Sequence, residues 1–181
     1  MRGFGFLVLW LGLGLSGLFS AAVAGVAPAD AAAVRERLVV LVRHAEKRLD
    51  QGADPGLNAL GEARARALAA ALADADVAAI VVTEFKRTQA TAAPLATARG
   101  LEPTVVATQA GGSADHAQAV AAAVRAAPAD VVLVVGHSNT VPAIIAALGG
   151  PEVAPIGDDD YGNLYLLWLG PERVRLVQTR Y

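Results

Sequence analysis

The sequence predicts one α/β domain, a three-layer α/β/α sandwich with a mainly parallel sheet and a C-terminal antiparallel hairpin. Two continuous apolar runs, LVVLV at 38–42 and VVLVV at 131–135, have the composition of strands buried on both faces of a parallel sheet. Elsewhere strand-like runs alternate with helical patterns, as they do in βαβ units. Only Gly170, Pro171 and Glu172 separate the last two strand-like runs, which favours a hairpin.

The elements follow along the chain from these patterns. After the strand at 38–42, a loop leads to Asn58, a residue type that favours helix N-caps. Apolar side chains then recur at helical spacing from Leu60 to Leu72, which predicts a helix behind that cap. The remaining elements are expected in the order strand 79–82, helix 86–98 with a kink at Pro94, strand 104–107, alanine-rich helix 114–126, strand 131–135, helix 140–148 ended by Gly149 and Gly150, and strands 164–169 and 174–179.

The N-terminal segment has the features of an export signal. Arg2 precedes an uncharged apolar stretch, and small residues follow up to Ala24. A basic start, an apolar stretch and an A-x-A site are typical of a secretory signal peptide. The alternative is an uncleaved membrane anchor at 3–27, since a span needs about 20 apolar residues. We expect a signal peptide at 1–24, a linker at 25–36 and an exported domain, periplasmic or extracellular, at 37–181.

The composition excludes several classes of function. The chain has 181 residues, which is typical of one domain, and 55% of them are hydrophobic, which argues against disorder. It has no cysteine, so disulfides, thiol nucleophiles and thiolate metal sites are excluded. With 15 Lys and Arg against 17 Asp and Glu and no basic run, the sequence does not predict nucleic-acid binding. The oligomeric state stays open.

Two histidines occupy matching places after the two buried strands. His44 follows the first strand after one residue, Arg43, and His137 follows the strand at 131–135 after one residue. The carboxyl ends of parallel strands lie along one edge of a sheet, where open α/β sheets bind ligands. Arg87, at the start of the helix after strand 79–82, should reach the same edge. The sequence therefore predicts that two imidazoles and two guanidinium groups converge.

These four side chains suit covalent transfer of a phosphoryl group. Arginine presents a planar fork of donors that matches phosphate oxygens. Neutral histidine has a nucleophilic nitrogen near pH 7, and nearby guanidinium charge keeps the imidazole neutral. We therefore expect His44 to attack phosphorus while Arg43, Arg87 and His137 hold the phosphoryl oxygens. The arrangement requires neither a metal nor another cofactor.

Four motifs, in order between residues 38 and 148, carry a resemblance to a known family. They are VLVRHAEK, LNALGEARARAL, TEFKRTQATA (83–92) and LVVGHSNT. Together they resemble the histidine phosphatase (phosphoglycerate mutase-like) superfamily, with Ala45 where its R-H-G-E motif has glycine. The resemblance implies an α/β/α sandwich, a phosphohistidine on His44, and a phosphate pocket made of Arg43, Arg87 and His137.

The proton donor is the weak point of this resemblance. Many members carry a glutamate downstream of the pocket arginine, and the corresponding region, AGGSADHAQ, has none. Asp115 is the candidate acid, with Glu84 and Asp160 as fallbacks, although Asp115 is also placed to cap a helix. Its neighbour His116 is expected on the surface. Lack of a clear donor resembles the short branch of the family.

Three other features of the sequence are open to a different interpretation. GHSNT is similar to the nucleophile elbow of serine hydrolases, with Ser138 as nucleophile, but that fold places its histidine after the serine and no histidine follows His137. The acidic run at 158–160 lacks a nearby histidine and favours a solvated loop over a metal site. A catalytically inactive module that binds a phosphorylated ligand stays open. The sequence thus predicts an exported phosphatase acting on a small phosphomonoester or phosphoanhydride.

Overall fold

The computed structural model describes residues 36–108 and 112–181. The predicted signal peptide at 1–24 and the predicted linker up to residue 35 lie outside the described residues. Within those two ranges, no helix is both long and apolar enough to cross a membrane.

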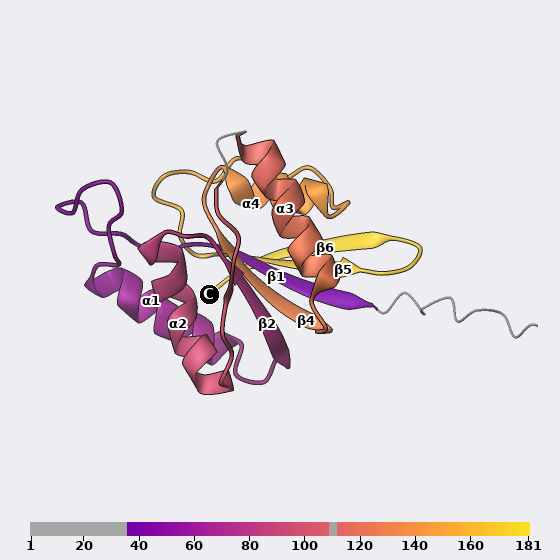
Figure 1. Ribbon diagram of the computed structural model, residues 1–181, viewed down its shortest axis with the longest axis horizontal. Helices are drawn as coiled ribbons and strands as arrows, with labels where there is room; N and C mark the ends of the chain where they lie inside the picture. The colour runs from indigo at the N-terminus through magenta and orange to yellow at the C-terminus, as the bar shows by residue number, and fades with distance from the viewer. Residues whose placement is uncertain (1–35, 109–111) are drawn as a thin grey trace, which may run out of the picture. The chain divides into compact units, whose positions relative to one another are not determined.

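Six strands of the described ranges form one sheet, in the order β3-β2-β4-β1-β5-β6 (Figure 1). The first four strands along the chain pair in parallel, and β5 joins β1 antiparallel. β5 and β6 form the predicted C-terminal hairpin. The strands are β1 (Arg37–Arg43), β2 (Val77–Val82), β3 (Thr104–Val105), β4 (Val131–Gly136), β5 (Asn163–Leu169) and β6 (Val174–Arg180).

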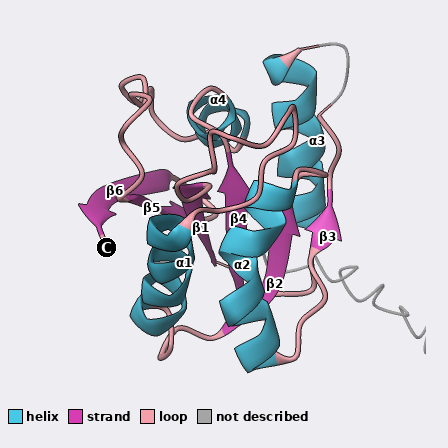
Figure 2. Cartoon of the chain, turned by 90° about the vertical axis from the view of Figure 1, so that its left-hand side faces the viewer, coloured by secondary structure: helices cyan, strands magenta, loops and turns pink. Residues whose placement is uncertain are grey.

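Helices cover both faces of the sheet, which confirms the three-layer α/β/α prediction. α1 (Ala59–Ala71) and α2 (Lys86–Arg99) pack side by side on one face (Figure 2). α3 (Ser113–Ala126) and α4 (Thr140–Ala147) cover the other face.

The two central strands explain why their sequences are continuously apolar. Alternate side chains of a strand point to opposite faces. Val39 and Leu41 of β1 belong to the core beneath α3 and α4, whereas Val40 and Val42 belong to the core beneath α1 and α2. All four are completely buried. Burial of each such side chain contributes about 1.5–3 kcal/mol to stability, so β1 stabilises the packing of helices on both faces of the sheet.

One strand differs from the sequence prediction. β3 is only two residues long, at the sheet edge, and both of its residues are exposed. Its continuation to 107 was wrong because an edge strand with no buried side chain has little packing to extend it. α2 continues through Pro94 to Arg99, in agreement with the helix predicted at 86–98, because Leu95 and Ala96 are buried in the core and hold the helix across the missing hydrogen bond.

Candidate active site

His44 and His137 leave the sheet at the same level, as the strand-end argument predicted. β1 and β4 pair so that Arg43 lies opposite Gly136, the residues immediately before the two histidines. The backbone N–H of His44 donates to the Gly136 carbonyl at 2.9 Å. The two ring centroids are 5.3 Å apart in an edge-on arrangement, and the residues are 4% and 7% exposed.

The ring of His44 is held by its own backbone. Nδ1 lies 2.8 Å from the Ala45 carbonyl oxygen. Because a carbonyl can only accept, this contact assigns the proton to Nδ1 and leaves a lone pair on Nε2. Among the described residues, none makes a hydrogen bond to that Nε2. The Ala45 N–H donates to Thr91 Oγ1 at 2.9 Å, which anchors the turn to α2.

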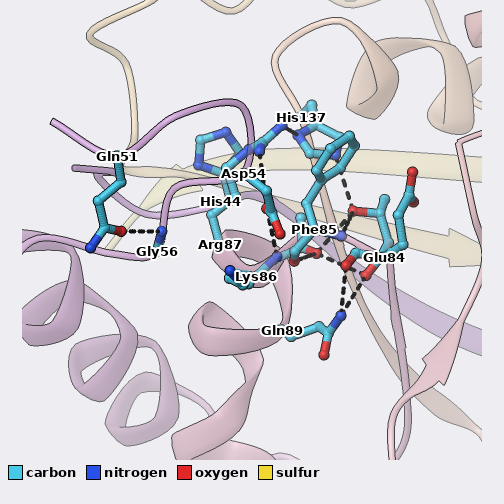
Figure 3. Close-up of polar contacts among 12 residues, drawn as sticks. His44, Gln51, Asp54, Gly56, Glu84, Phe85, Lys86, Arg87, Gln89 and His137 are labelled. Atoms are coloured by element: carbon cyan, nitrogen blue, oxygen red, sulfur yellow. Dashed lines mark hydrogen bonds and ion pairs between the residues drawn. The ribbon is translucent and has the colours of Figure 1, made fainter. Parts of the chain in front are cut away.

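The ring of His137 takes the opposite tautomer. Nε2 lies 3.1 Å from Thr83 Oγ1, Thr83 Oγ1 lies 2.9 Å from Thr88 Oγ1, and Thr88 donates to the Phe85 carbonyl at 2.8 Å. Read as a donor chain, these contacts place the His137 proton on Nε2. Nδ1 then accepts from Arg87 Nη2 at 3.4 Å (Figure 3).

Burial and positive charge keep both imidazoles neutral. Burial, opposed by the bond to Ala45 and assisted by the charges of Arg87 and Arg43, lowers the pKa of His44 to about 4. Burial, followed by the charge of Arg87, lowers the pKa of His137 to about 3. At pH 7 the site therefore holds two neutral imidazoles beside two guanidinium cations.

Arg87 extends from the first turn of α2 into this site (Figure 3). Its guanidinium carbon lies 4.2 Å from the centroid of the Phe85 ring, and its Nη1 lies 3.9 Å from Asp54 Oδ1. Burial lowers the pKa of the guanidinium, and its Nε is buried without a hydrogen-bond partner in the described ranges. An anion in the site would supply that partner.

Arg43 is oriented from the opposite side by a different set of contacts. Its Nη1 donates to the carbonyls of Gly157 and Asp158 at 2.6 and 2.8 Å. Its guanidinium carbon lies 4.2 Å from the centroid of the Tyr161 ring, a cation–π contact. As with Arg87, its Nε is buried and has no partner within the described parts of the chain.

A cavity of about 430 Å³ unites these groups. Arg43, His44, Arg87 and His137 all line it, so the predicted convergence is present. Its other lining side chains are mainly polar; they include Lys47, Thr108, Ser113, Ser138, Asn139 and Asp158. Its volume is that of a small-molecule site, and its charge suits an anion.

The first turn of α1 braces the loop that carries His44. Asn58 is the N-cap of α1, as predicted, and its side chain accepts from the Gly61 N–H at 2.8 Å. A Cβ atom at Gly61 would lie 2.9 Å from the Glu46 nitrogen, so only glycine permits this approach. Arg64 donates hydrogen bonds from Nε and Nη2 to the Glu46 carboxylate at 2.7–2.9 Å.

Asp115, the predicted proton donor, lies outside the cavity lining. It is exposed on the first turn of α3, and it does not cap that helix, because the N-cap residue is Gly112.

The two fallback acids also lie away from the lining. The Glu84 carboxylate accepts from the backbone N–H of Thr108 at 2.9 Å and from its hydroxyl. Asp160 pairs with Arg180 at 2.8 Å and accepts from Asn163 at 2.6 Å. None of the three candidate acids lines the cavity with the histidines.

The expectation that His116 is a surface residue was wrong. It is 1% exposed, its Nδ1 lies 3.1 Å from the Ala107 carbonyl oxygen, and its ring borders the cavity. The helical spacing that buries Val120 and Val124 places His116 on the same face of α3. That periodicity was readable in the sequence and would have indicated the burial.

Sequence reasoning also left several site residues without a role. Thr83, Phe85 and Thr91 all lie in the 83–92 motif, but only their contacts show that they orient His137, Arg87 and the turn after His44. Tyr161, which stacks on Arg43, comes from a loop far along the chain, and no local pattern indicates that contact.

Residues 39–108 match the family model of the histidine phosphatase superfamily (branch 1). No curated protein sequence matches the chain.

Solved structures share the fold. A mycobacterial glucosyl-3-phosphoglycerate phosphatase bound to inorganic phosphate is 21% identical, with a TM-score of 0.60 over 80% of this chain and 96% of that chain. A candidate phosphohistidine phosphatase, SixA, from Nakamurella multipartitia is 29% identical, with a TM-score of 0.52 over 74% and 84%. The protein histidine phosphatase SixA in complex with tungstate is 20% identical, with a TM-score of 0.62 over 79% and 96%.

The family match covers most of β1 and all of α1, β2, α2 and β3, which together carry Arg43, His44 and Arg87. His137 completes the arrangement from β4, beyond the matched segment. This family match and the shared fold make the chain similar to the histidine phosphatases of branch 1, and they support a phosphatase with a histidine nucleophile.

Proposed function

We propose that this protein is an exported phosphatase that hydrolyses a small phosphomonoester, or a phosphoanhydride, through a phosphohistidine on His44. The observation that carries the proposal is the tautomer of His44. Its Nδ1–H is held by the Ala45 carbonyl, which leaves the Nε2 lone pair at a cavity lined by Arg43, Arg87 and His137. A nucleophile and a set of phosphate donors thus share one site.

The chemistry runs in two displacements. His44 Nε2 attacks phosphorus, the N–P bond forms, the ester P–O bond breaks, and the leaving oxygen takes a proton. Arg43 and Arg87 stabilise the charge on the equatorial oxygens, since guanidinium forks match phosphoryl geometry. Water then attacks the phosphohistidine, the N–P bond breaks, and inorganic phosphate leaves.

The electrostatics favour the dianion and a neutral nucleophile together. Before substrate binds, the lowered pKa values keep His44 and His137 neutral. The net charge of the four side chains is then that of the two arginines. A bound dianion stabilises positive charge nearby and so raises the pKa of His137. Once protonated on Nδ1, His137 donates to a phosphoryl oxygen while its Nε2 stays bonded to Thr83.

A binding module without turnover is the second candidate. It is favoured by the positions of Asp115, Glu84 and Asp160, none of which lines the cavity to supply the leaving-group proton. Such a module would bind phosphate or vanadate at the same arginines but would release no phosphate from an ester.

The test is a phosphate-release assay on the full-length protein with a panel of phosphomonoesters and phosphoanhydrides. Arg87→Ala is expected to raise KM and lower kcat, because it removes a guanidinium that holds the transferring oxygens. Lys86→Ala is the matched control, since Lys86 is the exposed basic neighbour on the same turn. Vanadate binding with no release from any substrate would favour the binding module.

Export is part of the proposal and is supported by the apolar segment after Arg2 and the small residues up to Ala24. N-terminal sequencing of the protein recovered from the cell envelope is expected to begin at Gly25. Recovery of the uncleaved chain in membranes would favour the anchor at 3–27. An envelope location would favour a phosphorylated compound of that compartment as substrate.

A further inference from the structure

His116 is a third histidine at the same cavity, and only one of its two ring nitrogens makes a hydrogen bond within the described ranges. Nδ1 lies 3.1 Å from the Ala107 carbonyl oxygen, so Nδ1 carries a proton. Nε2 is buried and has no hydrogen-bond partner in the described ranges, although the residue is only 1% exposed. A buried polar atom without a partner is unfavourable and needs an explanation. Because His116 is among the residues that line the cavity, as His44 and His137 are, a ligand in that cavity can supply the partner.

The proposed reaction needs a proton donor for the leaving group, and the three predicted acids do not supply one. Asp115, Glu84 and Asp160 lie outside the cavity lining, and the last two are engaged in other hydrogen bonds. Asp158 lines the cavity, but it is exposed. His116 is a buried titratable side chain at the site to which the mechanism has given no role.

We propose that His116 is the catalytic proton donor to the leaving-group oxygen. This inference rests on the proposed function, in which His44 is the nucleophile. Protonated His116 gives its Nε2 proton to the oxygen as the ester P–O bond breaks, so the products are a neutral alcohol, neutral His116 and phosphohistidine. In the second step, neutral His116 takes a proton from the attacking water, and the N–P bond breaks as phosphate forms. His116 ends protonated, and the cycle closes without another reactant.

The charges around His116 suit that role. A phosphoryl dianion in the cavity brings negative charge to the residues that line it, His116 among them. Because Ala107 already holds Nδ1, Nε2 is the nitrogen left to exchange a proton with a ligand.

The experiment compares an ester that needs leaving-group protonation with one that does not. His116→Asn keeps a donor for the Ala107 carbonyl and deletes Nε2. It is expected to lower kcat/KM for an alkyl phosphate by about a hundredfold or more, and that for 2,4-dinitrophenyl phosphate by less than about threefold. Gln118→Ala, an exposed change on the same helix, is the control for effects on α3.

Other results would overturn the inference. Equal loss on both esters would give His116 a structural role only. Selective loss in Asp158→Asn, with none in His116→Asn, would move the donor to Asp158. If His116→Asn does not fold, His116→Gln and the wild type over a series of substituted phenyl phosphates replace it. A shallow dependence of the wild-type rate on the leaving group supports the proton donor, and a steep one contradicts it.

The same assays keep this inference separate from the proposed function. Turnover of 2,4-dinitrophenyl phosphate by the wild type, lost in His44→Ala, supports the nucleophile whatever His116 does. Absence of turnover with either ester in the wild type contradicts both proposals.

Discussion

At the residue scale, different hydrogen bonds hold the imidazoles of His44 and His137 in different tautomers. His44 is protonated on Nδ1 by its bond to Ala45, and His137 is protonated on Nε2 by its bond to Thr83. The first keeps a lone pair available for phosphorus, whereas the second keeps Nδ1 able to gain a proton beside the substrate. In the proposed mechanism, the same residue type thus serves as nucleophile and as switchable donor, because the neighbouring oxygens differ.

The first prediction concerns the protonation of these rings. We expect His44 and His137 to stay neutral as pH falls from 7 until about 4 and about 3, because burial lowers both pKa values. NMR titration of ¹⁵N-labelled histidines, assigned with single His→Asn variants, measures this directly. A midpoint near the ordinary value of about 6.5 for either ring would contradict the burial argument. Vanadate should raise the midpoint of His137, since it brings negative charge.

The positions of side chains at strand ends could be predicted from the sequence, whereas contacts between residues separated by long loops could not. Arg43, His44 and His137 could be placed because a buried strand fixes where its carboxyl end lies. Asp115, the predicted acid, lies outside the cavity lining, because its distance along the chain from Arg87 says nothing about which face α3 turns to the interior. That face presents His116 to the interior instead.

At the element scale, α1 acts as a brace for the loop that follows β1. Its first turn is fixed by the Asn58 cap, and its helix face lies against the backbone of Glu46. The Arg64–Glu46 pair adds a second tie between the same two segments. His44 lies two residues before Glu46, so the packing of α1 sets the position of the proposed nucleophile.

The second prediction tests this brace. Gly61→Ala is expected to destabilise the fold by about 1–3 kcal/mol, because the new Cβ meets the Glu46 backbone and forces α1 away. It should also lower kcat, since the displaced loop carries His44. Urea unfolding and a phosphatase assay measure the two effects. Gly52→Ala, where a Cβ meets nothing within 4 Å, is the control, and equal behaviour of the two variants would refute the brace.

Among the elements, those with a buried face were predictable and those at an edge were not. The doubly buried strands β1 and β4 were found because every side chain faces a core. The length of β3 was overestimated because its side chains bury nothing. The helix predicted at 86–98 does continue past Pro94, and the packing of Leu95 and Ala96 in the core stabilises it there.

At the scale of the whole molecule, catalytic groups are a source of acid sensitivity. The folded chain keeps His44 and His137 neutral at pH values where the unfolded chain would protonate them. Between about pH 6.5 and 4 the unfolded state therefore binds more protons, so stability falls as pH falls. Glu46 acts in the same direction at lower pH: burial raises its pKa, but the bonds from Arg64 outweigh burial and lower it overall.

The third prediction puts a size on this effect. The free energy of unfolding should fall by up to about 3 kcal/mol between pH 7 and 4 through His44 alone, from the difference between the two pKa values. Urea unfolding across this range, in buffers without phosphate, measures it. His44→Asn should flatten the slope, because its side chain does not titrate. A slope that is identical in wild type and variant would show that His44 does not carry the effect.

The central claim is that His44 Nε2 becomes covalently bonded to phosphorus. The most direct measurement is rapid mixing of the full-length protein with a phosphomonoester, quenching in alkali, and mass spectrometry of the peptides. The account predicts one phosphoryl group on the peptide that contains His44, stable in alkali, lost in acid and absent from His44→Ala. A phosphoryl group on another residue, or His44→Ala turning over at the wild-type rate, would contradict it.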